Sequence, residues 1–199
     1  MFNWLIGKPI SPRELWTWFQ AHAHEYRRRD LPKEHIKAFS RMLARVHRDL
    51  GWGIQPGESQ SDSWRLEISA EGKARLITQV EEVVSEAPPI PGWEICAFRQ
   101  AQPDARVRLQ KRELSSEDIL WVEEGWDEER IDLTLFVPME APLRADDLSH
   151  AGLLMLDATL GELMVMTRVG SLDFKHISVA PDRARPLSAL AGHILSQGS

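Results

Sequence analysis

Four polar side chains near the C-terminal end of the chain are of types that could perform general acid–base catalysis. Asp157 and Glu162 fall at a predicted helix–strand junction, and Asp173 and His176 follow the next predicted strand. Carboxylates beside an imidazole can transfer protons or hold a hard cation. The same residues also serve as ordinary helix-end and turn residues, and acid–base chemistry requires a specific geometry. We favour the structural interpretation and keep an enzyme of unfamiliar type, centred on these four residues, as the alternative.

The most unusual composition lies in Glu113–Asp132. This segment holds nine acidic residues against only Arg112, just before it, and Arg130. Tryptophans interrupt the acidic run, and an exposed aromatic ring among carboxylates is typical of surfaces that bind basic partners. The segment therefore predicts a protein-binding surface composed of Trp121, Glu123, Glu124, Trp126, Asp127 and Glu128. In the alternative interpretation, Trp121 packs inward on the sheet and the acids form a solvated rim.

Other site signatures are absent from the sequence. The chain has a single cysteine, Cys96, which rules out an internal disulfide and most thiolate zinc sites. His22 and His24 are two residues apart on a predicted helix, so their side chains point in different directions and cannot bind one ion. Phosphate-loop, dinucleotide, zinc-protease and nucleophile-elbow motifs are missing. We therefore expect neither a metal nor a cofactor.

Charge is distributed unevenly along the chain. Residues 1–50 contain 10 Lys/Arg against 5 Asp/Glu, whereas residues 51–199 contain 14 against 25. Arg27, Arg28 and Arg29 lie at the predicted end of a helix, where cations complement the helix dipole. A net charge of −6 without a nucleic-acid-binding motif argues against nucleic acid as a partner. A basic protein is the partner class that the composition favours.

Membrane and export signals are also lacking. The apolar run Phe2–Ile6 is too short for a secretory signal and is interrupted by Gly7. No stretch approaches the roughly 20 apolar residues of a membrane span. We expect a cytoplasmic protein that does not bind membranes, and the sequence does not define its oligomeric state.

Trp64–Arg99 is the segment around which we expect the fold to be organised. It is predicted to form a strand (Trp64–Ser69), a helix (Gly72–Glu86) and a second strand (Trp93–Arg99). The predicted helix carries five apolar residues at the spacing of one stripe: Leu76, Ile77, Val80, Val83 and Val84. Such a βαβ-like unit must bury the stripe of its helix on the adjacent sheet.

The N-terminal part predicts a helical hairpin. Ser11 and Glu14 form a capping box around Pro12, which predicts a helix from there to about Arg29. A second helix is predicted to begin near Asp30 and to end at Gly51. The polar, glycine-rich stretch 51–63 resembles a linker, but a 50-residue hairpin is too small to hold a core alone. We therefore expect a single α+β domain over residues 1–199, with 1–50 as a helical layer and 64–199 as sheet and helices.

Further strands and helices are predicted after the central unit. The predicted strands are Arg106–Gln110, Ile119–Glu123, Ile131–Val137 and Leu163–Val169. A hairpin turn is expected at 124–127, a helix between Asp147 and Gly161, and a closing helix over Pro186–Ser196. The predicted class is α+β, in which the N-terminal helical hairpin packs on a mixed sheet of about five or six strands with βαβ-like units.

Three pieces of the sequence, read together, resemble a group of uncharacterised bacterial proteins. These pieces are the segment from Ser69 to Pro88, the segment from Gly92 to Arg99, and Leu156–Asp157 with the following Gly161–Glu162. They cover less than half of the chain and include no catalytic motif. The resemblance implies a bacterial α+β domain and carries over no activity. Our functional expectation is therefore a non-enzymatic protein-binding domain, such as an adaptor or an immunity-like protein that neutralises a basic partner.

Overall fold

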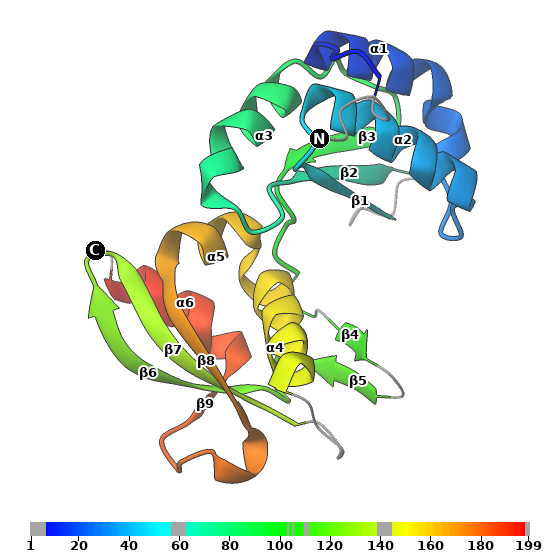
Figure 1. Ribbon diagram of the computed structural model, residues 1–199. Coiled ribbons are helices and arrows are strands. Elements are labelled where there is room, and N and C mark those ends of the chain that lie inside the picture. The colour runs from blue at the N-terminus through cyan, green and yellow to red at the C-terminus, as the bar shows by residue number, and fades with distance from the viewer. Residues whose placement is uncertain are drawn as a thin grey trace. The chain divides into compact units, whose positions relative to one another are not determined.

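The computed structural model describes residues 7–56, 63–102, 104, 106–109, 112–138 and 145–197. The chain forms two compact units, Met1–Arg99 and Gln100–Ser199, hereafter unit 1 and unit 2 (Figure 1). The expected single domain over residues 1–199 stays a prediction.

Unit 1 has a three-stranded sheet whose helices lie on one side of it (Figure 1). Its elements are α1 (Pro12–His22), the 3₁₀ helix η1 (Ala23–Tyr26), α2 (Lys33–Val46), β1 (Gly51–Pro56), β2 (Trp64–Ser69), η2 (Ala74–Leu76), α3 (Ile77–Ser85) and β3 (Trp93–Ala97). In the order β1-β2-β3, β2 pairs antiparallel with β1 and parallel with β3. The parallel pair with its connecting helix is the βαβ unit that the sequence predicts.

The stripe of α3 is buried where the spacing predicts it. Leu76, Val80 and Val83 are each at most 2% exposed, whereas Val84 is half-buried. The helix ends at Ser85, before two prolines that cannot continue it. Leu66 and Ile68 of β2 are fully buried on the central strand that α3 contacts. The predicted packing of this helix on the sheet is therefore confirmed.

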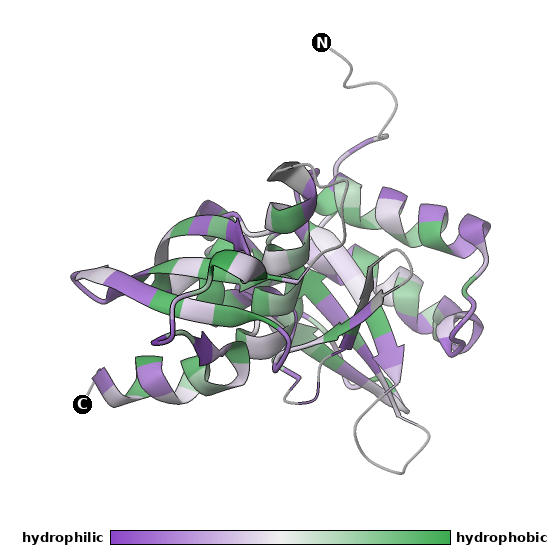
Figure 2. Ribbon diagram, turned by 90° about the horizontal axis from the view of Figure 1, so that it is seen from below, coloured by the Kyte–Doolittle hydropathy of each residue, from purple (hydrophilic) through white to green (hydrophobic). Residues whose placement is uncertain are grey.

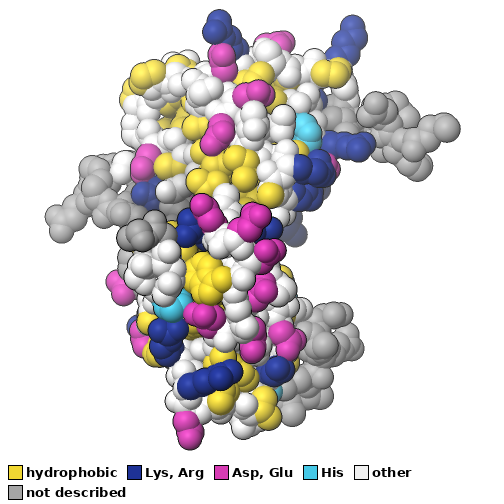
Figure 3. Space-filling view, turned by 90° about the vertical axis from the view of Figure 1, so that its left-hand side faces the viewer, with side chains coloured by type: hydrophobic (Ala, Val, Ile, Leu, Met, Phe, Trp, Pro, Cys, Tyr) yellow, Lys and Arg dark blue, Asp and Glu magenta, His cyan; other side chains and the backbone are white. Residues whose placement is uncertain are grey.

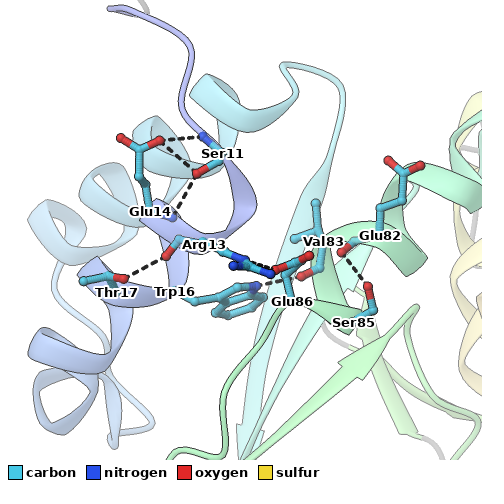
Figure 4. A network of polar contacts seen from close by, with 9 residues as sticks. All are labelled: Ser11, Arg13, Glu14, Trp16, Thr17, Glu82, Val83, Ser85 and Glu86. Atoms are coloured by element: carbon cyan, nitrogen blue, oxygen red, sulfur yellow. Dashed lines mark hydrogen bonds and ion pairs between the residues drawn. The ribbon is translucent and has the colours of Figure 1, made fainter.

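The helix α1 begins with the predicted capping box, in which the Ser11 side chain accepts from the N–H of Glu14 and the Glu14 carboxylate accepts from Ser11 (Figure 4). On its inner face, Trp16 Nε1 donates to the carbonyl oxygen of Val83, 2.6 Å away, and so joins α1 to α3. This bond satisfies the polar atom of a buried tryptophan, as burial requires.

Aromatic rings fill the space between α1, α2 and the sheet. Phe19 contacts Phe39 and Trp93 at centroid distances of 5.4 and 5.0 Å. Phe39 also lies 4.7 Å from Trp52 of β1. Because these contacts join both helices to both edge strands, the hairpin of α1 and α2 is part of the core of unit 1 and not a separate module.

The described residues of unit 2 form a four-stranded sheet, a short hairpin, three α-helices and two 3₁₀ helices. Its elements are β4 (Arg106–Leu109), β5 (Arg112–Ser115), β6 (Leu120–Asp127), β7 (Arg130–Val137), α4 (Ala145–Leu160), α5 (Glu162–Arg168), β8 (Val169–His176), η3 (Ile177–Val179), β9 (Arg185–Pro186), η4 (Leu187–Ala189) and α6 (Leu190–Gln197). The strand order is β8-β7-β6-β9, with β7 and β8 parallel and the other pairs antiparallel; β4 and β5 pair with each other in a separate antiparallel sheet.

The core of unit 2 lies between one face of this sheet and the helices. Figure 2 shows hydrophobic residues alternating with hydrophilic ones along strands and helices, as one-sided burial requires. Fully buried members come from the strands (Ile131, Leu135), from α4 (Met155, Leu156) and from α6 (Ile194). A single core cluster therefore holds all three helices of unit 2 against its sheet.

The predicted α+β class is confirmed, and the strand arrangement differs from the expected one. The strands are distributed over sheets of three, two and four strands, where a mixed sheet of about five or six was expected. Both larger sheets contain a βαβ unit, because the pairs β2–β3 and β7–β8 are parallel.

Some predicted elements have different identities in the structure. Gly51 begins β1, which occupies the first part of the predicted linker; residues 57–62 lie outside the described residues. The predicted strand Leu163–Val169 is mostly the helix α5, and the strand β8 follows it. An apolar run of this length fits a buried helix or a strand equally well, so periodicity could not separate the two.

The described residues contain no single helix that is long and apolar enough to cross a membrane. Asp147–Leu160 and Glu162–Arg168 meet that requirement only together, and they are bent by 106° at Gly161. Their buried residues belong to the core of unit 2, which is the usual place of such apolar helices in a folded domain.

Candidate functional site

The acidic segment forms most of the β6–β7 hairpin of unit 2. The sequence predicted a turn at 124–127, but β6 continues to Asp127 and the turn consists of Glu128 and Glu129. The pairing register shifts between Glu123 and Gly125, which marks a β-bulge at Glu124. The hairpin is therefore longer than predicted, and its tip is more acidic.

The bulge determines which way Trp126 faces. Glu123 pairs with Leu133 and Trp126 pairs with Ile131, and both partners belong to the buried face of β7. In a regular strand, residues three apart would point to opposite faces. The extra residue in the bulge brings Trp126 to the same face as Glu123 and Trp121.

Glu123, Trp121 and Trp126 surround His193 of α6. His193 Nε2 lies 2.7 Å from Glu123 Oε2. The His193 ring is 5.0 Å from Trp121 and 6.2 Å from Trp126. Sequence reasoning missed His193, which lies 70 residues from Glu123 and carries no local signal. This group, hereafter the Trp–His–Glu cluster, attaches α6 to β6.

Trp121 belongs to the core. It is fully buried, and its Nε1 donates to the carbonyl oxygen of Pro186 at 2.9 Å. The guanidinium of Arg185 lies 4.0 Å from the ring centroid, which is a cation–π contact. Trp121 therefore cannot be an exposed anchor in this conformation, and the inward-packing interpretation describes it correctly. Trp126, by contrast, is half-buried at the edge of the core.

The carboxylates around the hairpin differ in how they are paired. Glu124 Oε1 accepts from the hydroxyl of Thr134 at 2.7 Å, and Asp132 accepts from the N–H of Ser171 at 2.6 Å. The bond from Ser171 lowers the pKa of Asp132 from its ordinary value. Glu129 lies 3.4 Å from Arg168 across an exposed surface. These acids have structural partners in addition to water.

Asp127 and Glu128, at the tip, are different. Both are exposed, and neither carboxylate has a hydrogen-bond or ion-pair partner among the described residues. Glu128 also has φ 53, a left-handed conformation that glycine adopts at lower cost. The neighbouring Arg130 directs Nε and Nη2 to the carbonyl oxygen of Val169. Figure 3 shows acidic side chains gathered on the face of unit 2 that carries β6.

The alternative catalytic residues are spread along unit 2. Asp173 lies on the strand face opposite to the core, where its exposed carboxylate is 3.1 Å from Lys175 Nζ. This lysine lowers the pKa of Asp173. His176, three residues further along β8, points to the other face, and its Nδ1 lies 2.7 Å from Ser178 Oγ.

Asp157 and Glu162 lie toward the opposite end of the sheet. The helix α4 runs back along the parallel pair β7–β8, and its Gly152 approaches Phe174 near the ends of those strands. Asp157 is five residues beyond Gly152 in α4. It therefore lies about 7.5 Å farther along the helix axis, away from the strand end that carries His176. Glu162 is fully buried at the start of α5. The four side chains therefore do not converge on one reaction centre.

The described part of the chain contains no group of three or more His, Cys, Asp and Glu side chains that could hold a metal ion. His22 stacks on Trp18 at a centroid distance of 4.7 Å, and its Nδ1 lies 2.7 Å from the carbonyl oxygen of Trp18. His22 is half-buried, whereas His24 is exposed.

A second polar arrangement occurs on the sheet of unit 1. The residues of β2 that alternate with Leu66 and Ile68 include Arg65 and Glu67, which are only 7% and 5% exposed. Arg65 Nε lies 3.0 Å from Glu94, and Gln55 donates to Glu67 at 2.7 Å. Their alternation with apolar residues was visible in the sequence, but the burial of both charges was not.

Cys96 lies on the same face as these charges. Burial, followed by the nearby Glu94 carboxylate, raises the pKa of its thiol to about 11. A thiol with so high a pKa is a poor nucleophile at neutral pH, because the thiolate is the reactive form. Cys96 is therefore a poor candidate for a nucleophile in covalent catalysis.

No family model, curated protein or solved structure matches this chain. The resemblance to a group of bacterial α+β proteins therefore stays a prediction, and function has to be inferred from the geometry of the chain itself.

Proposed function

We propose that this chain is a non-enzymatic protein-binding domain that binds a basic protein partner through the acidic tip of its β6–β7 hairpin. The binding surface consists of Glu123, Glu124, Trp126, Asp127, Glu128 and Glu129. Trp121, expected as part of this surface, supports it from the core instead. An adaptor or an immunity-like protein is the class that this surface fits.

The proposal rests on one observation, the exposed and unpaired carboxylates of Asp127 and Glu128. Both carboxylates are exposed and have no partner among the described residues, although five acids occur within the seven residues 123–129. Adjacent like charges repel one another, and Glu128 adds the cost of a left-handed backbone. The described residues supply neither carboxylate with a hydrogen bond or an ion pair, whereas a basic partner would relieve the repulsion and be steered toward it.

Trp126 supplies the apolar part of the surface. Its ring is half-buried against His193, so its orientation is fixed before a partner arrives. A preorganised ring gives up little conformational freedom on binding, which is why tryptophan is frequent among binding hot spots. The Glu123–His193 contact holds the same region in place from beneath.

The proposal is tested by measuring the affinity of a short lysine homopeptide for wild type and for Asp127→Asn/Glu128→Gln/Glu129→Gln. We expect wild-type binding to weaken by about tenfold when salt rises from about 50 to about 300 mM, because screening shortens the reach of the charges. The hairpin variant should bind at least about tenfold more weakly at low salt.

A matched control removes three acids elsewhere: Glu81→Gln/Glu82→Gln/Asp182→Asn changes exposed residues of α3 and of the β8–β9 connection. It alters net charge by the same amount and should keep most of the affinity. Equal weakening in both variants would show that the peptide responds to net charge alone, and the hairpin would lose its proposed role.

Glu128→Gly separates function from stability. Glycine adopts φ 53 without steric strain, so this change should raise the free energy of unfolding by up to about 1 kcal/mol. It should simultaneously weaken peptide binding, because one unpaired carboxylate is removed. Urea denaturation and peptide titration of the same preparation measure both effects. Unchanged affinity would argue that Glu128 has no part in binding.

A further inference from the structure

The outer face of α2 in unit 1 carries a row of cations. Lys33, Lys37 and Arg41 follow one another at intervals of four residues and therefore lie on one side of the helix. All three are exposed, and none of their side chains has a hydrogen-bond or ion-pair partner among the described residues. Phe39 and Leu43, which are buried, face the opposite way. We call Lys33, Lys37 and Arg41 the basic row.

Helix stability does not account for the basic row. Like charges four residues apart destabilise a helix, and the row contains two such pairs. Lys33 is also the first residue of α2, where the helix dipole favours an acid. Residues 27–48 as a whole contain 8 Lys/Arg against 2 Asp/Glu. Glu34, three residues before Lys37, is the one acid of α2, so the basic row keeps a net positive charge, opposite in sign to that of the hairpin tip.

The two surfaces also match in size and in apolar content. The basic row spans about 12 Å along the helix axis, since its ends are eight residues apart. The acidic strand end from Glu124 to Asp127 spans about 10 Å. Ile36, which is 42% exposed, lies beside Lys33 and Lys37 on α2, and the half-buried Trp126 directly precedes Asp127 on β6, with its ring on the other face of the strand. Each surface therefore offers one apolar side chain bordered by charges.

We propose that the basic row of α2 binds the acidic β6–β7 tip of a second copy of this chain. This proposal rests on the proposed function, since it names the basic partner of the hairpin. Contact between the surfaces relieves the like-charge repulsion in both, and Ile36 and Trp126 lose exposed apolar area. Association is expected to weaken with salt, because both charge clusters are exposed.

Sedimentation velocity of the full chain tests this proposal. At about 50 mM salt the wild-type sedimentation coefficient should rise with protein concentration, and at about 500 mM salt this rise should shrink at least several-fold. Two variants, Lys33→Glu/Lys37→Glu/Arg41→Glu and Asp127→Lys/Glu128→Lys/Glu129→Lys, should each remain monomeric at low salt. A wild-type chain that is monomeric at every concentration and salt would overturn the proposal.

The decisive experiment mixes the two charge-reversed variants. Each variant alone has two surfaces of like sign, but the mixture restores a complementary pair in both combinations. We expect association to return in the equimolar mixture. The control Lys175→Glu/Arg183→Glu reverses two exposed cations of unit 2 and should associate as wild type does. Failure of the mixture to associate, or loss of association in this control, would overturn the proposal.

Circular dichroism verifies that each variant is folded. If the triple reversal on α2 unfolds, Lys33→Gln/Lys37→Gln/Arg41→Gln replaces it and should also be monomeric.

Lysine-peptide binding separates this proposal from the proposed function. Hairpin-dependent peptide binding by a chain that never self-associates would overturn the second-copy proposal and retain the function. Absence of both peptide binding and self-association would overturn both.

Discussion

The two βαβ units of this protein differ in how apolar residues are distributed on the helices that connect their parallel strands. In unit 1, β2 and β3 are connected by η2 and α3, whose apolar residues form one stripe with Glu81 and Glu82 on the exposed side. In unit 2, β7 and β8 are connected by α4 and α5, whose apolar residues occur on more than one side. Leu153 and Leu154 of α4 are 45% and 38% exposed, whereas Met155 and Leu156 are buried.

This difference shows what hydrophobic periodicity can specify. A helix with one apolar stripe defines its own buried face, so the position of α3 follows from its residues. A helix that is apolar on several sides does not, and its orientation is decided by what packs on it. In α4 the buried side is the one that meets Phe174 and the core strands.

The largest expected effect comes from removing residues 1–50. The helices α1 and α2 cover one side of the β1–β2–β3 sheet, and their loss exposes rings such as Trp52 and Trp93. We expect the remainder, 51–199, to aggregate. Residues 100–199 provide the comparison, because their core cluster is composed of their own residues, and we expect this fragment to unfold cooperatively in urea.

The outcome for the two fragments also bears on domain organisation. Cooperative unfolding of 100–199 would show two domains where the sequence predicts one. A soluble, cooperatively folded 51–199 chain would contradict the role assigned to α1 and α2.

Val80→Asp should have the next largest effect. Val80 is fully buried in α3, so the substitution places an unpaired carboxylate in the core and should cost about 4 kcal/mol or more. Val84→Asp, in the same helix but half-buried, should cost clearly less because water can reach the carboxylate. Thermal denaturation of both variants measures the difference. Near-native melting of Val80→Asp would contradict the packing of the α3 stripe.

Tryptophan truncation in unit 2 should have a smaller effect that depends on position. Trp121→Ala removes a fully buried ring and the bond to Pro186, and should cost about 3–5 kcal/mol. Trp126→Ala removes a half-buried ring at the core edge and should cost about 1–2 kcal/mol. Urea titrations give both values. Equal costs would mean that the bulge does not place the two rings as described.

Several features of the fold could be predicted from sequence because local residues determine them. The capping box at Ser11 and Glu14 defines where α1 begins, since it satisfies N–H groups that a helix leaves unpaired. The stripe of α3 and the two prolines after it define that helix and its end. These signals lie within a few residues of the structure they specify, so the α+β class and most element positions followed from them.

Tertiary structure decided the features that depend on distant residues. The bulge at Glu124 turns Trp126 toward the core face, and the reason lies in the register between β6 and β7, not in the local sequence. His193 meets Glu123 only because α6 packs on that face. For the candidate site, the sequence identified the acidic segment and its tryptophans from composition. Packing decided that Trp121 is core, that Trp126 is half-buried and that the free carboxylates are at the tip, because burial depends on what each side chain meets across the sheet.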